Sequence, residues 1–129
     1  MGIESISAVT LAVRNMEHSV RFYEDVGFQL HHGGKDASFT SFRVGTGFLN
    51  LILSSHTKFV WWGRTIFWVT DVDEVYRRLT DLGLKPEGEP RDAEWGERYF
   101  HIWDPDGHEL SFAKALPWAE WALDRASTQ

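Results

Sequence analysis

The feature that most constrains the fold of this chain is a weak internal repeat with an offset of 56 residues. Residues 9–30, VTLAVRNMEHSVRFYEDVGFQL, align with residues 65–86, TIFWVTDVDEVYRRLTDLGLKP, so that Gly27 matches Gly83. A strand, a tight turn and a further strand follow each copy. Because a repeat of this length corresponds to one supersecondary unit per copy, the sequence predicts two related modules.

Each module is predicted to have the element order βαβββ. Apolar residues alternate with small ones in the segment 8–13, which is typical of a strand. Asn15 can cap the helix that follows, and Gly27 can end it in a left-handed conformation. The second module repeats these signals with Asp71 and Gly83.

The predicted fold class is therefore α+β, with two βαβββ modules forming a cupped mixed sheet and helices on its outer face. We expect a single domain over residues 1–129, with module one at about 5–55 and module two at about 63–115. The segment DPDG at 104–107 suits a type I turn. A proline near the start of about 117–126 indicates a short C-terminal helix.

Alternation along the strands assigns residues to the two faces of the sheet. The face expected to pack on the helices carries Val9, Leu11, Val13, Leu49, Leu51, Leu53, Thr65, Phe67, Val69, Phe100, Ile102, Leu110 and Phe112. The other face carries Ala8, Thr10, Ala12, Phe48, Asn50, Ile52, Arg64, Ile66, Trp68, Tyr99, His101, Trp103, Glu109 and Ser111. This mixture favours a concave ligand-binding face, and a second core dotted with polar groups is the alternative.

Composition excludes several classes of function. There is no cysteine, so thiolate chemistry and disulfides are excluded, and no apolar run is long enough to span a membrane. No Lys/Arg cluster suggests nucleic-acid binding. We expect a cytoplasmic protein without a cofactor, whose net charge of −6 favours a cationic ligand and whose seven tryptophans suit an aromatic pocket.

Several motifs together resemble the vicinal oxygen chelate superfamily, which includes glyoxalase I, extradiol dioxygenases, fosfomycin-resistance enzymes and bleomycin-resistance binding proteins. They are AVTLAV followed by SVRFYEDVGF, then FWVTDVDEVYRRLTDLG, and the ending DPDGHELSF. The resemblance covers about Ser5 to Ala115. It supports the two-module fold, whereas the same fold hosts many activities.

The resemblance also indicates where metal-dependent members place their ligands: a histidine on the first strand of a module and a glutamate four residues after the glycine of DPDG. The matching positions here are Ala8, Arg64 and Ser111. A methyl group, a guanidinium and a lone hydroxyl do not make a site for a divalent cation. We therefore expect no metal and no catalytic residue carried over from the family.

An unorthodox metal site remains open, built from His101 and Glu109 with a third residue, because catalytic metals use about three protein ligands. His101 is also open to two readings, as a general base beside Tyr99 and Glu109 or as a histidine that only binds or packs. His108 should point to the helix side or to solvent. The histidines expected on the surface are His18, His31, His32 and His56.

Arg64 and Glu109 are expected on neighbouring strands, where two roles are open. They can form a partly buried ion pair, or Arg64 can bind an anionic group of a ligand with its planar fork. The two roles are compatible if the ligand displaces the carboxylate.

Within the superfamily the chain looks most similar to the metal-free bleomycin-resistance proteins, because EWGERYFHIWDPDGHELSF resembles their ending and places Trp95 at a ligand-stacking position. That resemblance implies a homodimer that sequesters an aromatic or amphipathic, cationic molecule, for example in antibiotic resistance. Trp61, Trp62 or the C-terminal helix could be buried in the dimer. The expected ligand-binding residues are Trp95, Trp68, Trp103, Tyr99, Phe48, Asn50, Arg64, His101, Glu109 and Ser111.

Two other functions remain open. One is a metal-dependent enzyme of the glyoxalase or dioxygenase type that uses ligands such as His101 and Glu109. The other is a vestigial member of the family that serves as a partner-binding dimer. Trp95 itself has a structural alternative, as a loop residue that closes over the core.

Overall fold

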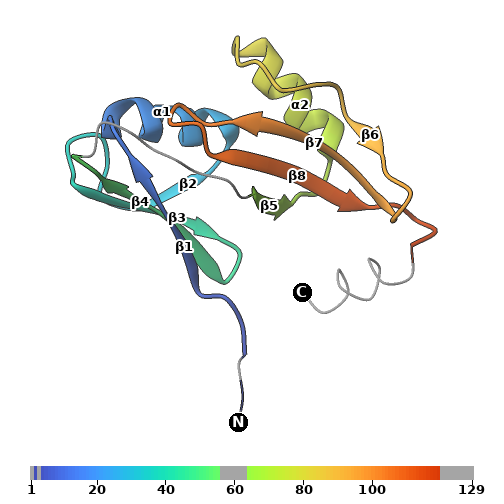
Figure 1. The fold of residues 1–129 in the computed structure, drawn as a ribbon, viewed down its shortest axis with the longest axis horizontal. Coiled ribbons are helices and arrows are strands. Elements are labelled where there is room, and N and C mark those ends of the chain that lie inside the picture. The colour runs from blue at the N-terminus through green and yellow to red at the C-terminus, as the bar shows by residue number, and fades with distance from the viewer. Residues whose placement is uncertain (1, 3, 56–63, 120–129) are drawn as a thin grey trace. The chain divides into compact units, whose positions relative to one another are not determined.

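The computed structural model of the chain describes residues 2, 4–55 and 64–119. These residues group into two compact units, each with its own sheet and helix (Figure 1). Of the described residues, unit 1 contains 2, 4–55 and 104–107, and unit 2 contains 64–103 and 108–119. Each unit has the predicted order βαβββ.

Unit 1 contains a four-stranded mixed sheet in the order β1-β4-β3-β2. Strand β1 runs parallel to β4, and the other neighbours are antiparallel. Helix α1 packs against this sheet, with Met16, Val20 and Tyr23 buried. The elements are β1 (Ala8–Val13), α1 (Met16–Val26), β2 (Gln29–His32), β3 (Phe39–Val44) and β4 (Gly47–Leu53).

Unit 2 repeats this topology in the order β5-β8-β7-β6. Strand β5 is parallel to β8, and the other two pairs are antiparallel. Helix α2 contacts β7 and β8. The elements are β5 (Arg64–Trp68), α2 (Val72–Asp81), β6 (Arg91–Asp92), β7 (Glu97–Trp103) and β8 (Glu109–Ala115).

The ends of both helices lie where the sequence predicts them. The side chain of Asn15 accepts a hydrogen bond from the backbone N–H of His18, and that of Asp71 accepts one from Glu74. Gly27 ends α1 with a φ of 119°, a conformation that costs glycine little because it has no Cβ. Leu82 caps α2, and the predicted stop, Gly83, follows with a φ of 84°.

The faces predicted to pack on the helices form the cores. In unit 1 the rings of Tyr23 and Phe42 lie 5.7 Å apart and are fully buried. In unit 2 Phe100 and Phe112 stack with a centroid distance of 5.5 Å, and Tyr76 of α2 meets Phe100 edge to face. Among the residues assigned to these faces, Leu53 at the end of its strand is 45% exposed.

The expectation of one continuous sheet is wrong, and the expected C-terminal helix lies mostly outside the described residues. The strands form two four-stranded sheets, whereas one cupped sheet was expected, because the described strand pairings all lie within a module. The predicted C-terminal helix at about 117–126 lies mostly outside the described residues, and within the described part residues 117 and 118 form a turn. Among the described residues, neither α1 nor α2 is long and apolar enough to cross a membrane.

The DPDG segment forms the predicted turn, and its two carboxylates are held within unit 1. The backbone N–H of Gly107 donates to the carbonyl of Asp104 at 3.0 Å. The hydroxyl of Tyr23 donates to Asp104 Oδ2 at 2.8 Å, whereas Arg14 and Ser19 donate to Asp106 at 3.0 and 3.2 Å. The turn that joins β7 to β8 is therefore anchored beside α1.

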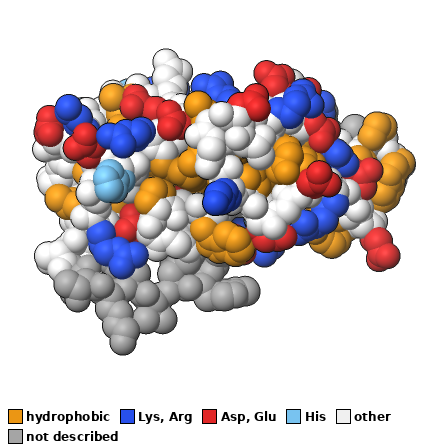
Figure 2. Space-filling view, turned by 90° about the horizontal axis from the view of Figure 1, so that it is seen from above, with side chains coloured by type: hydrophobic (Ala, Val, Ile, Leu, Met, Phe, Trp, Pro, Cys, Tyr) orange, Lys and Arg blue, Asp and Glu red, His pale blue; other side chains and the backbone are white. Residues whose placement is uncertain are grey.

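Charged side chains of both signs are interspersed on the surface seen in Figure 2, with hydrophobic side chains between them. Arg98 of β7 forms ion pairs with two carboxylates, that of Asp73 at 2.8 Å and that of Asp92 at 2.9 Å. The hydrogen bonds from Arg98 lower the pKa of the Asp73 carboxyl. The pair with Arg98 therefore favours the ionised form of Asp73.

Candidate ligand-binding face

Strand register places most of the predicted site residues on one face of the sheet in unit 2. Phe100 and Phe112 pack toward α2, so the residues that alternate with them point to the opposite side. We call this side the non-helical face of unit 2. Its members are Arg64, Ile66 and Trp68 from β5, Glu109, Ser111 and Ala113 from β8, and Tyr99, His101 and Trp103 from β7.

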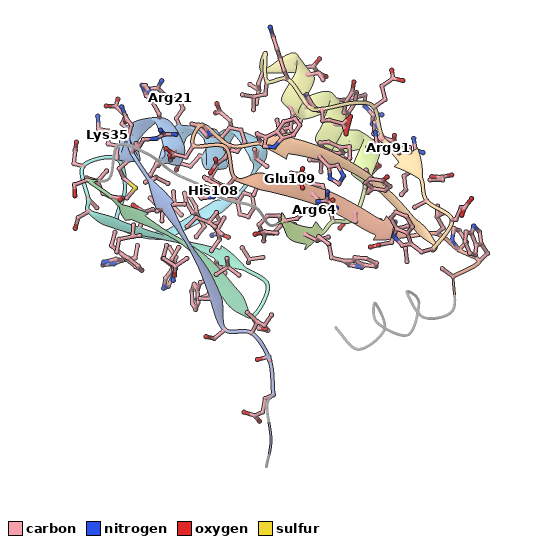
Figure 3. All side chains as sticks on the ribbon, viewed as in Figure 1. Arg21, Lys35, Arg64, Arg91, His108 and Glu109 are labelled. Atoms are coloured by element: carbon pink, nitrogen blue, oxygen red, sulfur yellow. The ribbon has the colours of Figure 1, made fainter. Side chains whose placement is uncertain are left out.

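An ion pair lies at one end of this face. Arg64 and Glu109 are register partners on β5 and β8, and Arg64 Nε donates to Glu109 Oε2 at 2.5 Å (Figure 3). The side chain of Arg64 is 45% exposed, whereas that of Glu109 is 22% exposed. The predicted pairing is therefore present, and the guanidinium is the more accessible partner.

His101 lies at the centre of the face and is 8% exposed. Its Nδ1 is buried without a hydrogen-bond partner among the described residues. Burial lowers the pKa of the imidazole, and the nearby Arg64 lowers it further, whereas Glu109 opposes the shift. The neutral ring, which is favoured above its lowered pKa, has one nitrogen that donates and one that accepts a hydrogen bond.

Aromatic rings gather around Tyr99. The ring of Trp95 stacks on Tyr99 with a centroid distance of 5.7 Å and an interplanar angle of 30°, and the centroid of the His101 ring lies 5.0 Å from that of Tyr99. The indole Nε1 of Trp95 donates to Glu97 Oε1 at 2.8 Å. Trp95 is 57% exposed, so a large flat surface is held in a defined orientation while facing solvent.

Two residues that sequence reasoning missed complete this cluster. Arg91 lies in register with Tyr99, places its guanidinium carbon 4.9 Å from the centre of that ring and donates from Nε to the Tyr99 hydroxyl at 3.1 Å. Glu87 accepts from Arg91 at 2.9 Å, and this bond lowers the pKa of the Glu87 carboxyl. The strand that positions Arg91 has two residues, too few for a pattern of alternation.

Phe48 and Asn50 were predicted for the same site but lie in unit 1. The guanidinium carbon of Arg43 is 4.9 Å from the centre of the Phe48 ring, and the His31 ring lies 5.0 Å from it. The amide of Asn50 donates to the Thr10 hydroxyl at 3.4 Å. These residues form a polar and aromatic patch on the first sheet.

The remaining predictions concern the family's metal positions and the other histidines. Ala8 opposes Phe48 in register, and Ser111 opposes His101. Over residues 2, 4–55 and 64–119 there is no group of three or more His, Asp or Glu side chains that could hold a metal ion. His18, His31 and His32 are exposed as predicted, His56 lies outside the described residues, and His108 is buried.

Comparison with known proteins gives a consistent picture. A search of curated proteins finds no match. Among solved structures, the chain is similar to lactoylglutathione lyase from Agrobacterium tumefaciens, with 22% identity and a TM-score of 0.75 over 92% of this chain and 98% of that one. It is also similar to TioX from Micromonospora sp. ML1, with 25% identity and a TM-score of 0.72 over 88% and 100% of the two chains.

A third similar structure is the fosfomycin resistance protein FosX from Listeria monocytogenes, with 17% identity and a TM-score of 0.71 over 86% of this chain and 91% of that one. The model of the Glyoxalase/Bleomycin resistance protein/Dioxygenase superfamily matches residues 5–112. Because this match covers most of the chain, the protein belongs to the Glyoxalase/Bleomycin resistance protein/Dioxygenase superfamily.

Proposed function

We propose that this protein binds a small aromatic or amphipathic molecule on the non-helical face of unit 2, without a protein-bound metal ion. Family membership is compatible with this function but does not select it, because the same fold carries enzymes and binding proteins. The residues of the face itself carry the argument.

The observation that carries the proposal is the orientation of Trp95. An exposed tryptophan would ordinarily lose side-chain freedom when a ligand stacks on it, which weakens binding. Here the hydrogen bond to Glu97 and the stacking on Tyr99 already restrict the ring, although it is 57% exposed. A flat ligand can therefore stack on Trp95 with little further loss of side-chain entropy.

The donor groups at the family's metal positions support binding without a metal. Ala8 offers no ligand atom, and Arg64 is positively charged and already bonded to Glu109. Ser111 offers a single hydroxyl, and its register partner His101 is the nearest imidazole along the face. This set suits the recognition of an organic molecule better than the coordination of a divalent cation.

The test uses a neutral probe, in which a naphthalene ring is joined through an amide and a pentamethylene chain to a carboxamide. We expect Trp95→Ala to weaken binding of this probe by about 1–3 kcal/mol, because a stacked aromatic side chain is lost. Isothermal titration calorimetry measures the Kd. Trp118→Ala is the matched control, since Trp118 is also exposed but lies outside the strands. Equal affinity of the Trp95 variant and the unchanged protein would reject the proposal.

A metal-dependent enzyme is the second candidate, and the observation that favours it is that His101 Nδ1 has no hydrogen-bond partner in the described part of the chain. His101 and Glu109 would supply two of the three protein ligands that catalytic metals ordinarily use. Metal analysis of protein purified without chelator separates the candidates. One equivalent of Zn, Ni, Mn or Fe that is lost in His101→Ala would favour the enzyme.

A further inference from the structure

The guanidinium of Arg64 uses few of its donors within the protein. Its Nε bonds Glu109, and neither Nη has a hydrogen-bond partner among the described residues. Arginine has five N–H donors arranged in a plane, and the two Nη groups form a fork that matches a carboxylate. The bond at Nε orients this fork while leaving it accessible, because the side chain is 45% exposed.

The charges near the centre of the face also favour an anion. Burial is the main cause that lowers the pKa of the His101 imidazole, and Arg64 lowers it further, whereas Glu109 opposes the shift. The accessible guanidinium of Arg64 presents a positive charge on this face, although the whole chain carries a net charge of −6. A ligand responds to the potential at its site more than to the total charge.

Apolar side chains border the Arg64–Glu109 pair. Ile66 follows two residues along β5, and Trp103 is the register partner of Glu109 on β7; both are exposed. Tyr99, which carries the Trp95 stack, lies four residues from Trp103 along the same strand. Four residues of a strand span about 13 Å, which is a suitable separation for the two ends of an amphipathic molecule.

We infer that the ligand of this face carries a planar anion of the carboxylate class, which the Nη fork of Arg64 binds while the aromatic part stacks at Trp95 and Tyr99. This inference rests on the proposed function, because it assigns the charge of a ligand whose aromatic part that proposal describes. It departs from the cationic ligand that the net charge suggests.

The arrangement disfavours a cation in a specific way. The acceptor available to a cation is Glu109, which is the less exposed partner and already accepts from Arg64 Nε. A cation would have to displace the guanidinium or lie beside it against Coulomb repulsion. A carboxylate needs no such rearrangement, because it meets donors that have no partner in the described part of the protein.

The test compares three probes that share the naphthalene, amide and chain described above and end in a carboxylate, a carboxamide or an ammonium group. We expect the carboxylate probe to bind about tenfold or more tightly than the carboxamide probe, as for hydrogen bonds between charged groups. Arg64→Gln should remove this preference, and Arg64→Lys should retain part of it, because lysine keeps the charge but lacks the fork. Affinity for the carboxamide probe should change less than twofold in both variants.

Arg43→Gln is the matched control, since Arg43 is also an exposed arginine beside an aromatic ring but belongs to unit 1. If this variant loses the preference as fully as Arg64→Gln does, the preference reflects net charge and the inference is wrong. Tighter binding of the ammonium probe, with dependence on Glu109, would also overturn it. Binding of all three probes with equal affinity would reject the anion site and leave the aromatic face intact, whereas binding of none would reject both.

Discussion

The non-helical faces of the two sheets share one register and differ in chemistry. In unit 1 the row across β1, β4 and β3 reads Ala8, Phe48 and Arg43, and in unit 2 the equivalent row across β5, β8 and β7 reads Arg64, Glu109 and Trp103. The first row places a cation over an aromatic ring. The second pairs a cation with a carboxylate and has the aromatic residue beside that pair.

The next two rows extend the difference. Thr10, Asn50 and Ser41 in unit 1 correspond to Ile66, Ser111 and His101 in unit 2, and Ala12, Ile52 and Phe39 correspond to Trp68, Ala113 and Tyr99. Unit 1 therefore has small hydrogen-bonding groups where unit 2 has an imidazole whose Nδ1 has no hydrogen-bond partner among the described residues. A repeated backbone fixes where side chains point, whereas their chemistry varies independently in each copy.

The largest effects on the free energy of unfolding should come from the buried faces that pack on the helices, where the two units are alike. Phe42 and Phe100 are fully buried in the cores of unit 1 and unit 2. Replacing either by alanine should lower the free energy of unfolding by about 3–5 kcal/mol, because each change removes a buried ring and leaves a cavity. Denaturant unfolding measures both variants, with Trp118→Ala as an exposed control. A loss below about 1 kcal/mol in only one unit would contradict the similarity of the cores.

A smaller effect distinguishes two tyrosine hydroxyls. That of Tyr23 donates to the buried carboxylate of Asp104 at 2.8 Å, whereas that of Tyr99 accepts from the exposed Arg91 at 3.1 Å. Tyr23→Phe should lower the free energy of unfolding by about 1–3 kcal/mol, because a buried charged group loses a donor. Tyr99→Phe should change it by about 0.5 kcal/mol or less. Equal losses would show that the polar contacts on the face of unit 2 are as important for stability as those that anchor the turn.

The smallest effect should be a dependence of stability on pH that arises from His101. Its pKa in the folded protein is lower than the unfolded value of about 6.5, so the unfolded chain binds more protons between these two values. Stability should be unaffected by this group above about pH 6.5 and should decrease as the pH falls through the interval. His101→Gln should reduce that decrease in thermal or denaturant unfolding at several pH values.

The control for this prediction is His31→Gln, because His31 is an exposed histidine beside Phe48 on the first sheet. If His31→Gln and His101→Gln alter the pH dependence equally, the environment of His101 is not special. The two faces would then be more alike than their contacts indicate.

Much of the fold could be predicted because its signals are local. The caps at Asn15 and Asp71 depend on residues within one helical turn, and the turn at 104–107 depends on four consecutive residues. Alternation along each strand correctly separated the core side from the other side for most of the residues assigned. The pairing of Arg64 with Glu109 followed from the same reasoning combined with the family topology.

Contacts over long sequence distances were harder to predict. The carboxylates of Asp104 and Asp106 bond to Tyr23, Ser19 and Arg14, which are more than 80 residues away in the chain. Nothing in the DPDG motif indicates those partners. The role of Arg91 was missed for a related reason. Strand β6 is too short to show a pattern of alternation, and Arg91 contacts the Tyr99 ring only because the two residues are register partners on β6 and β7.

The sequence by itself determined the repeat, the helix ends and the side of the sheet on which each strand residue lies, because steric and hydrogen-bonding rules for neighbouring residues set these features. The family resemblance predicts that Ala8, Arg64 and Ser111 stand at the family's metal positions, and their side chains alone make poor ligands for a divalent cation. Only the tertiary structure decided that Trp95 is held by Glu97 and Tyr99 and that the Arg64 fork is left accessible. The Arg64–Glu109 pair joins residues that are 45 positions apart in the chain, and the exposure of the Arg64 and Trp95 side chains depends on how the strands pack, which no local pattern specifies.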